Sequence, residues 1–512
     1  MTQPMATNPA AGAAKNAGFH DDVPVDPSPS TSHRAPSILW LRRDLRLHDH
    51  PALTAALAGG RPVVPLYILD EVLLAGRWAS PNRAWFLAGC LRELGAALEA
   101  RGGRLLVLRG RPADLVPAVA RAFGAEEVHV SRDYAPYGRR RDRAVAQTLA
   151  AAGRRLVEHP GVLIREPEAI RTRTGGRYAV FTPFRRTWEA ATIRDLLPAP
   201  AHVPFPSTWP DGEAWAVQPA TPELAPIPTA RPSLLPAPGE AAARERLARW
   251  LDPGPTGLDG YARRRNLVGE DGTSRLSADL RWGSLSPLEV LVRAVTHADV
   301  QPAVFTSELA WRDFYAHLLW WEPHLARDPF DPRAADLAWR NDPDEIAAWR
   351  TGQTGYPIVD AAMRQLLATG WMHNRARMIV ASFLAKDLFV DWRIGEAHFM
   401  AHLVDGDPAA NNGGWQWSAS TGADAQPWFR VFNPTLQGER FDPDGAYVRR
   451  WVPELARVPV ARIHRPWTLS PADQATYGCR IGHDYPAPIV DHADSRARAL
   501  AAWSAVRAAS RD

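Results

Sequence analysis

The sequence reads WMHNRARM at residues 371–378, DWR at 391–393 and DGDPAANNGGWQW at 405–417. These motifs mix basic, acidic and amide side chains with tryptophans, in a stretch whose other residues are apolar enough to be buried. Burying a charge or an amide is costly unless a polar partner satisfies it. The stretch therefore predicts a large ligand with polar edges and a flat aromatic face, held inside a helical core.

Helical periodicity surrounds these motifs. Apolar residues recur at three- and four-residue intervals, which is typical of packed helices, in the segments 240–252, 286–298, 305–322, 358–369, 373–390 and 395–404. We therefore expect an all-helical domain over 241–512. An interdomain linker over 171–240 precedes it, and its proline-rich part should be extended on the surface because proline fixes φ and lacks a donor.

The N-terminal part alternates short apolar runs with amphipathic segments. The apolar runs, which read as buried strands, are 37–41, 63–69, 104–108, 127–130 and 154–159. The helical segments between them are 83–100, 112–123 and 139–151. This alternation predicts an α/β domain over 37–170 with a five-stranded parallel, Rossmann-like sheet. The first crossover, 42–53, has no G-x-G-x-x-G, so the standard dinucleotide fingerprint is absent.

Composition narrows the possible classes of protein. A chain of 512 residues is too long for one simple core, so two domains are expected. Its two cysteines, Cys90 and Cys479, cannot alone hold an iron–sulfur cluster or a structural zinc, and they fit a reducing cytoplasm. No apolar run approaches the roughly 20 residues that span a bilayer. Residues 1–36 lack the apolar core of a signal peptide and are expected to be a disordered tail.

The net charge is only weak evidence for a nucleic-acid partner. The net charge is only +4, but all except two of the 60 basic residues are arginines. GC-rich codon usage explains this bias, and arginine also suits bidentate contacts with phosphates.

Polar residue groups outside the opening motifs also suit a ligand. In GTSRLS (272–277), hydroxyls and backbone N–H groups at a helix start suit a phosphate, although Ser and Thr there are commonly simple caps. In SELAWRDFY (307–315), helical spacing puts Glu308, Trp311, Arg312 and Tyr315 on one face. The alternative for that face is a solvated Glu308–Arg312 pair.

The opening motifs predict specific contacts. Asn374, Arg377 and Met378 share a helix face, and Arg377 requires a buried carboxylate, for which Asp405 is the candidate. A calcium site at Asp405 and Asp407 is not expected, because the EF-hand spacing and its final Glu are missing, so no metal is predicted. His373 reads as an ordinary core or surface histidine. The run 411–414, Asn-Asn-Gly-Gly, allows a flat ligand to approach the backbone closely.

Taken together with TGYPIVDAAMRQL (354–366) and DWRIGE (391–396), these motifs resemble the photolyase/cryptochrome family, and within it the bacterial class I cyclobutane-pyrimidine-dimer photolyases. The resemblance runs from about Ser37 to the end of the chain. It implies an antenna-binding α/β domain, a wrapping linker and a helical domain that holds FAD in a U-shape.

The resemblance also implies roles for individual residues. The implied FAD-binding positions are Tyr261, Thr273, Ser274, Arg275, Leu276, Ser277, Glu308, Arg312, Tyr315, Asn374, Arg377, Asp405, Gly406, Asp407 and Asn411. The implied lesion- and DNA-binding positions are Arg265, Glu308, Trp311, Asn374, Arg375, Met378 and Trp417. The implied catalytic positions are Glu308, Asn411, which faces flavin N5, and the electron-transfer chain Trp415, Trp392 and Trp339. Trp349 is close to Trp339 in sequence, so the outer end of the chain stays open between them.

The implied activity is a light-driven carbon–carbon lyase. Excited FADH⁻ gives an electron to a flipped-out dimer in double- or single-stranded damaged DNA, the cyclobutane ring opens, and the electron returns. Asn374 and Met378 stand where the (6-4) branch has histidines, and Trp417 is intact, which favours the cyclobutane dimer. A monomer in the bacterial cytoplasm is expected.

Two matters stay open at this point. The stretch 132–142, RDYAPYGRRRD, lies where folate-type members place an acidic residue, while its PYGR portion is closer to deazaflavin-type members, so either could be a second antenna chromophore. One alternative function is a blue-light receptor with the same flavin site. Another is a flavoenzyme that works in the dark, but no motif supports it.

Overall fold

The computed structural model describes residues 35–208, 210, 227–297 and 302–509. The expected disordered tail, 1–36, lies almost entirely outside the described residues, as does part of the proline-rich linker. Within the described ranges, no helix combines the length and apolar content needed to cross a bilayer.

A five-stranded parallel sheet forms the N-terminal domain, as the sequence predicted. Its strands are β1 (Ser37–Leu41), β2 (Val63–Asp70), β3 (Leu106–Gly110), β4 (Glu127–Ser131) and β5 (Arg155–His159). They lie in the order β3-β2-β1-β4-β5, with Ile38 of β1 opposite Val64 on one side and Val128 on the other. The strand order reverses at β1, and the carboxyl edge beside such a switch point is where open α/β sheets leave a crevice.

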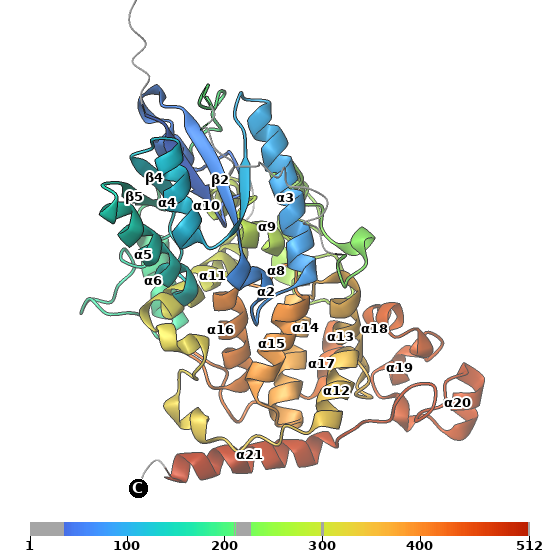
Figure 1. Ribbon diagram of the computed structural model, residues 1–512. Helices are drawn as coiled ribbons and strands as arrows, with labels where there is room; N and C mark the ends of the chain where they lie inside the picture. Colours follow the sequence, from blue (N-terminus) through green and yellow to red (C-terminus); the bar gives the residue numbers. More distant parts are fainter. Residues whose placement is uncertain (1–34, 209, 211–226, 298–301, 510–512) are drawn as a thin grey trace, which may run out of the picture. The chain divides into compact units, whose positions relative to one another are not determined.

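Helices cover both faces of this sheet (Figure 1). Alternate residues of β1 point to opposite faces, because side chains alternate along a strand. Leu39 and Leu41 pack with α1 (Pro51–Ala56) and α3 (Pro81–Glu99). Ile38 and Trp40 pack with α4 (Pro112–Ala122) and α5 (Pro136–Ala151). Burial on both faces explains why the strands read as continuous apolar runs.

The segment after β1 joins the sheet to the helical domain. The N–H of Leu45 donates to the carbonyl of Trp282 (3.2 Å), and Arg46 Nη1 donates to the carbonyl of Gly283 (3.1 Å). Gly283 has a φ of 68°, and a Cβ there would lie 1.9 Å from the carbonyl oxygen of Arg43. Only glycine meets both demands, so this contact between the domains depends on it.

The linker contains a helix that the sequence analysis did not predict. Helix α6 (Phe181–Ala190) buries Phe181, Phe184 and Trp188. These three residues fall on one helical face, a pattern obscured by Pro183 and by the two arginines between them. Trp188 Nε1 also donates to the buried Asp313 Oδ2 (2.9 Å), which ties the linker to the helical domain.

The C-terminal domain is helical, as predicted. Its α-helices are α7 (Glu240–Leu251), α8 (Leu258–Arg264), α9 (Ser277–Trp282), α10 (Pro287–Val295), α11 (Ala303–Trp321), α12 (Pro343–Thr351), α13 (Pro357–Thr369), α14 (Asn374–Ser382), α15 (Trp392–His402), α16 (Pro408–Ala419), α17 (Pro434–Phe441), α18 (Ala446–Trp451), α19 (Val460–Ile463), α20 (Pro471–Tyr477) and α21 (His492–Ala509). The expected helix over 373–390 is instead α14 followed by a π-helical turn, Phe383–Asp387.

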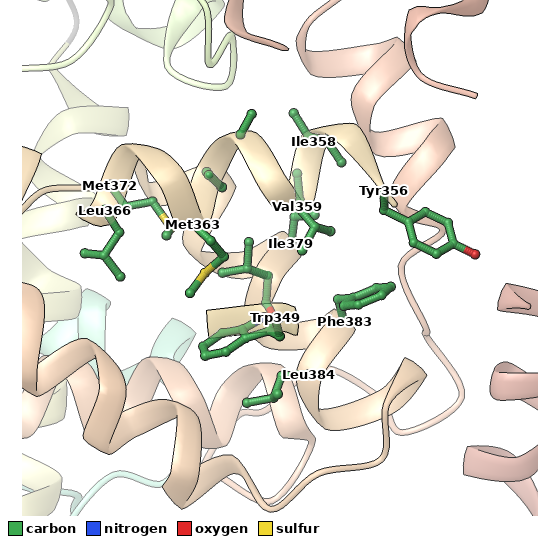
Figure 2. Packing of buried hydrophobic residues seen from close by; sticks show 14 of the residues in the cluster. Trp349, Tyr356, Ile358, Val359, Met363, Leu366, Met372, Ile379, Phe383 and Leu384 are labelled. Atoms are coloured by element: carbon green, nitrogen blue, oxygen red, sulfur yellow. The ribbon is translucent and has the colours of Figure 1, made fainter. Parts of the chain in front are cut away.

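The core of this domain is built around aromatic side chains. Figure 2 shows Trp349 among Met363, Ile379 and Leu384, which come from α13, α14 and the π-helical turn. Trp392 and Trp415 belong to the same cluster of buried side chains. The opening sequence motifs therefore lie on helices packed directly against this core.

Candidate functional site

The ion pair expected between α14 and the turn before α16 is present. Arg377 Nη2 lies 2.8 Å from Asp405 Oδ2, and Arg377 Nε donates to the carbonyl of Met372 (2.9 Å). The Asp405 side chain is only 2% exposed, whereas that of Arg377 is 26% exposed. Asp405 Oδ1 is buried and has no hydrogen-bond partner among the described residues. A buried carboxylate oxygen without a partner marks a place where a ligand can donate.

A cluster of arginines makes this region electropositive. His373 caps α14, because its Nδ1 accepts the N–H of Arg375 (3.1 Å). Burial and, to a smaller extent, the nearby charges of Arg275, Arg375, Arg377 and Arg265 together lower the pKa of His373 to about 3. His373 is thus a neutral capping residue, in line with the ordinary role expected for it. The positive potential around it suits phosphate groups.

The 273–277 loop carries free polar groups beside this cluster. Leu276 is the N-cap of α9 and gives no side-chain cap, so the simple capping alternative for this motif does not apply. Within the described part of the chain, the hydroxyls of Thr273, Ser274 and Ser277 have no hydrogen-bond partner. Arg275, with a φ of 52°, bonds Asp271 (2.6 Å) and lies over the Trp371 ring at 4.5 Å.

Tyr261, another expected cofactor position, lies on α8. Its side chain is buried, with its ring edge-on to Trp250 at 5.5 Å and Arg265 over it at 5.5 Å. Burial raises the pKa of its hydroxyl, so Tyr261 stays a neutral donor.

On the polar face of α11, Glu308 pairs with a residue outside its own helix. Glu308 Oε1 accepts from Arg265 Nη1 at 2.7 Å, so the alternative pair between Glu308 and Arg312 does not form. On α14, Asn374 Nδ2 lies 3.9 Å from Met378 Sδ, which brings these two predicted lesion contacts together. Arg375, expected beside them, bonds Asn266 Oδ1 through both Nε (3.1 Å) and Nη2 (2.8 Å).

Trp311 has a partner that sequence reasoning missed. Its ring lies face to face with the ring of Phe181, with centroids 3.7 Å apart and planes at 9°. Tyr315, one turn further along α11, lies 5.4 Å from Trp311. The aromatic spacing of FTPF at 181–184 was the available signal, but it stood in a segment assigned to the interdomain linker.

Arg312 and Asp407 use their polar atoms on protein partners at the domain boundary. Arg312 Nη2 donates to the carbonyl of Val162 (2.8 Å). Asp407 Oδ1 caps α16 by accepting the N–H groups of Ala409 (2.9 Å) and Ala410 (3.0 Å). Its Oδ2 is paired with Arg43, another residue that the sequence did not single out. Both predicted cofactor contacts therefore also hold the two domains together.

The run at 411–414 is helical, since it lies within α16. Asn411 Nδ2 donates to the carbonyl of Glu396 (3.1 Å), which fixes the amide and leaves its oxygen unbonded by the described residues. A Cβ on Gly413 would lie 2.1 Å from Tyr315, so that glycine permits close helix packing. A Cβ on Gly414 would meet nothing within 4 Å. Of the two glycines expected to admit a ligand, only Gly414 borders open space.

The tryptophans of the expected electron-transfer chain differ in how deeply they are buried. Trp415 and Trp392 are buried, and Trp415 Nε1 has no partner among the described residues. Trp339 is half-buried and packs on Phe389 with ring centroids 4.9 Å apart. Trp349 is fully buried, with its ring 6.0 Å from that of Trp415. Trp339 thus lies nearer the surface than Trp349.

Trp417, also on α16, is half-buried. Gly406, the last of the expected cofactor positions, lies where a Cβ would meet Arg83 Nη1 at 2.5 Å. In the described part of the chain, no three His, Cys, Asp or Glu side chains converge as a metal site would require.

These features fit a flavin dinucleotide. The unpartnered Asp405 Oδ1 can accept from a ring N–H, the free amide oxygen of Asn411 offers a second acceptor, and Gly414 leaves its side of α16 open. The hydroxyls of the 273–277 loop and the nearby arginines suit a diphosphate.

Comparison with known proteins agrees with the fold. A family model described as DNA photolyase matches residues 37–204, and one described as the FAD binding domain of DNA photolyase matches 305–505. A deoxyribodipyrimidine photo-lyase from Streptomyces griseus is 44% identical over 464 residues, covering 90% of this chain and 98% of that protein. The one from Escherichia coli is 39% identical, covering 92% and 98%.

Solved structures give the same result. A bacterial class III photolyase from Agrobacterium tumefaciens is 40% identical with a TM-score of 0.84, and covers 92% of this chain and 98% of that one. A Synechocystis cryptochrome is 32% identical with a TM-score of 0.83, over 91% and 98%. These identities do not distinguish class I, which the sequence analysis expected, from class III. Because the similarity to the photo-lyases spans both domains and nearly their full length, the chain belongs to the DNA photolyase family.

Proposed function

We propose that the chain is a deoxyribodipyrimidine photo-lyase that uses light to split cyclobutane pyrimidine dimers in DNA. The observation that carries this proposal is the 39–44% identity, over both domains, to several enzymes of that name. The similarity to a cryptochrome is lower, at 32% identity, so the blue-light receptor alternative has less support.

The cofactor we propose is FAD, which when reduced and excited by light supplies an electron to the dimer. Arg377 and Asp405 would hold the polar edge of its ring, and the hydroxyls of Thr273, Ser274 and Ser277 its diphosphate. This assignment is supported by the unpartnered Asp405 Oδ1 and by the family model for an FAD binding domain.

The residues proposed to bind the lesion combine flat and polar surfaces. Trp311 and Trp417 would stack on the flipped-out bases, and base–aromatic stacking contributes about 1–3 kcal/mol per base. Glu308 would accept hydrogen bonds from a base edge while Arg265 offsets its charge; the two are 2.7 Å apart. Asn374 and Met378 would complete the wall. A damaged base pair is the easiest to flip, which gives selectivity.

Two further sets of residues would support the reaction. Asn411, fixed by its bond to the Glu396 carbonyl, would present its amide oxygen to flavin N5. Trp415, Trp392 and Trp339 would carry electrons inward from the surface. The support for Trp339 as the outer member is that Trp349 is fully buried.

The finer assignments follow the sequence motifs. We propose class I, a monomeric enzyme of the bacterial cytoplasm, with folate or deazaflavin as a second chromophore in the α/β domain. An archaeal photolyase from Sulfolobus tokodaii, 31% identical, is described as having two FAD molecules, with the implication of a novel light-harvesting cofactor. Extracting and identifying the pigments of the purified protein would decide the antenna.

The decisive experiment illuminates the reduced, flavin-loaded protein with an oligonucleotide that contains one cyclobutane dimer. We expect the dimer to disappear in blue light and to persist in the dark. Binding of the same oligonucleotide in the dark should weaken as the salt concentration rises, because arginine–phosphate contacts release counterions. Persistence of the dimer under illumination, with the flavin fully reduced, would reject the proposal. Light-dependent self-association without repair would favour the receptor.

A further inference from the structure

We propose that Phe181 is a positioning residue for lesion recognition: it covers one face of the Trp311 indole and leaves only the opposite face for a base. The proposal rests on the proposed function, since it concerns how the stacking wall of that site is built. Phe181 belongs to the linker helix α6 and to none of the motifs that suggested the site.

The contact between the two rings is unusually complete. Their planes are 9° apart and their centroids 3.7 Å apart, whereas most aromatic pairs are offset or edge-on with centroids at 4.5–7 Å. Phe181 is 7% exposed, while Trp311 is half-buried. One face of the indole is therefore against Phe181, and its exposed area lies elsewhere on the ring.

Phe181 is itself fixed by the segment that follows α16. It is the first residue of α6, and the N-cap of that helix, Val180, gives no side-chain cap. Asp424 Oδ2 accepts the N–H of Phe181 instead, at 3.1 Å. The turn that contains Asp424 is closed onto α16 by the bond from the Gln426 N–H to the Trp417 carbonyl (3.2 Å). Through this turn, Phe181 connects the two proposed stacking walls, Trp311 and Trp417.

The remaining neighbours hold the Phe181 ring from behind. Phe314 meets it edge-on with centroids 5.7 Å apart, and Phe184 lies at 6.4 Å with planes at 29°. The indole of Trp311 is thus set in place before any DNA arrives. A preset wall loses less side-chain entropy on binding than a mobile one, so the preference for damaged DNA should depend on Phe181.

The test is a binding measurement in the dark with the flavin-loaded protein and its Phe181→Leu variant. The probes are one oligonucleotide with a single cyclobutane dimer and the same sequence without it. We expect Phe181→Leu to weaken binding of the dimer-containing strand by about 3- to 10-fold, on the scale of one aromatic pair, and to leave the undamaged strand within about 2-fold. Phe181→Tyr, which keeps the ring, should restore the preference.

Phe184→Leu is the matched control. It changes the same residue type in the same buried helix, and Phe184 makes no ring contact with Trp311 among the described residues. We expect it to lower the unfolding midpoint without changing the ratio of the two affinities. If Phe181→Leu does not fold, Asp424→Ala removes the anchor of Phe181 while keeping both rings, and should reduce the same ratio.

Specific outcomes would overturn the inference. An unchanged affinity ratio in folded Phe181→Leu would do so, as would an equal loss on both strands, or a matching loss in Phe184→Leu. Trp311→Ala separates this failure from that of the proposed function. If Trp311→Ala abolishes the preference while Phe181→Leu does not, only the role of Phe181 is wrong. If the parent protein has no preference, the proposed function itself fails.

Discussion

Replacing Arg377 with Met should destabilise the protein by leaving a buried charge unpaired. Asp405 is 2% exposed, and Arg377 is the described cation that pairs with it, at 2.8 Å. The other carboxylate oxygen has no partner in the described structure. Removing one member of a buried ion pair typically costs about 3–5 kcal/mol. Because Arg377 is itself 26% exposed, water reaches its side of the pair, and the lower end of that range applies.

The expected loss in unfolding free energy is therefore about 3 kcal/mol. The assay is urea unfolding of the parent, Arg377→Met, Asp405→Asn and the double variant, followed by tryptophan fluorescence. The double variant should be more stable than Arg377→Met alone, because it no longer buries an unpaired carboxylate. The flavin absorbance retained by each purified protein gives a second readout, and it should fall in every variant that alters Asp405.

A loss below about 1 kcal/mol in Arg377→Met would refute the reasoning, since it would mean that Asp405 finds another cation or is hydrated. A double variant no more stable than Arg377→Met would also contradict it. In that case the cost would come from the lost Arg377–Met372 bond rather than from the unpaired charge.

Three other predictions concern single positions. Trp415→Phe should block photoreduction of the flavin but spare repair by chemically pre-reduced protein; full photoreduction, followed by absorbance under illumination, would exclude Trp415 from the electron path. Burial raises the pKa of Glu396 from 4.5 to about 7. Between these pH values the folded state keeps a proton that the unfolded state has lost. The free energy of unfolding therefore falls by about 3 kcal/mol as the pH rises through this range. Glu396→Gln should lack this loss, so its urea midpoint relative to the parent should rise from pH 5 to pH 8; a constant difference would contradict the assignment. Gly413→Ala places a methyl 2.1 Å from Tyr315 and should cost about 1–3 kcal/mol, whereas Gly414→Ala on the same helix should keep its urea midpoint, and equal losses would refute the packing argument.

The elements that sequence reasoning predicted well are those set by local periodicity. The strand segments around Ser37 and Val63 were found because burial on both faces leaves an uninterrupted apolar run. The pairing of Arg377 with Asp405 was also predictable, because a cation on a buried helix face needs a carboxylate and few were near enough in the motif.

Other features depended on contacts between distant segments, which no local pattern contains. Helix α6 was missed because Pro183 and a pair of arginines interrupt its short apolar pattern, although Phe181 and Trp188 pack in one cluster with residues of α11. The glycines at 413 and 414 looked equivalent in sequence, yet one is pressed against Tyr315 and the other borders open space. The Glu308–Arg312 pair was rightly kept as only an alternative, but the actual partner of Glu308, Arg265 at the end of α8, is 43 residues away and no local pattern indicates it.

The segment after β1 links the α/β domain to the helical domain, so the two domains should not be separable without loss. Arg43 pairs with the residue that caps α16, and Leu45 and Arg46 bond the carbonyls of Trp282 and Gly283. If the chain were cut in the linker and the C-terminal half expressed alone, the helix that carries Asn411, Trp415 and Trp417 would lose an external clamp at its first turn. The α/β domain therefore supports the first turn of α16, and a C-terminal fragment expressed without it should bind less flavin than the full chain.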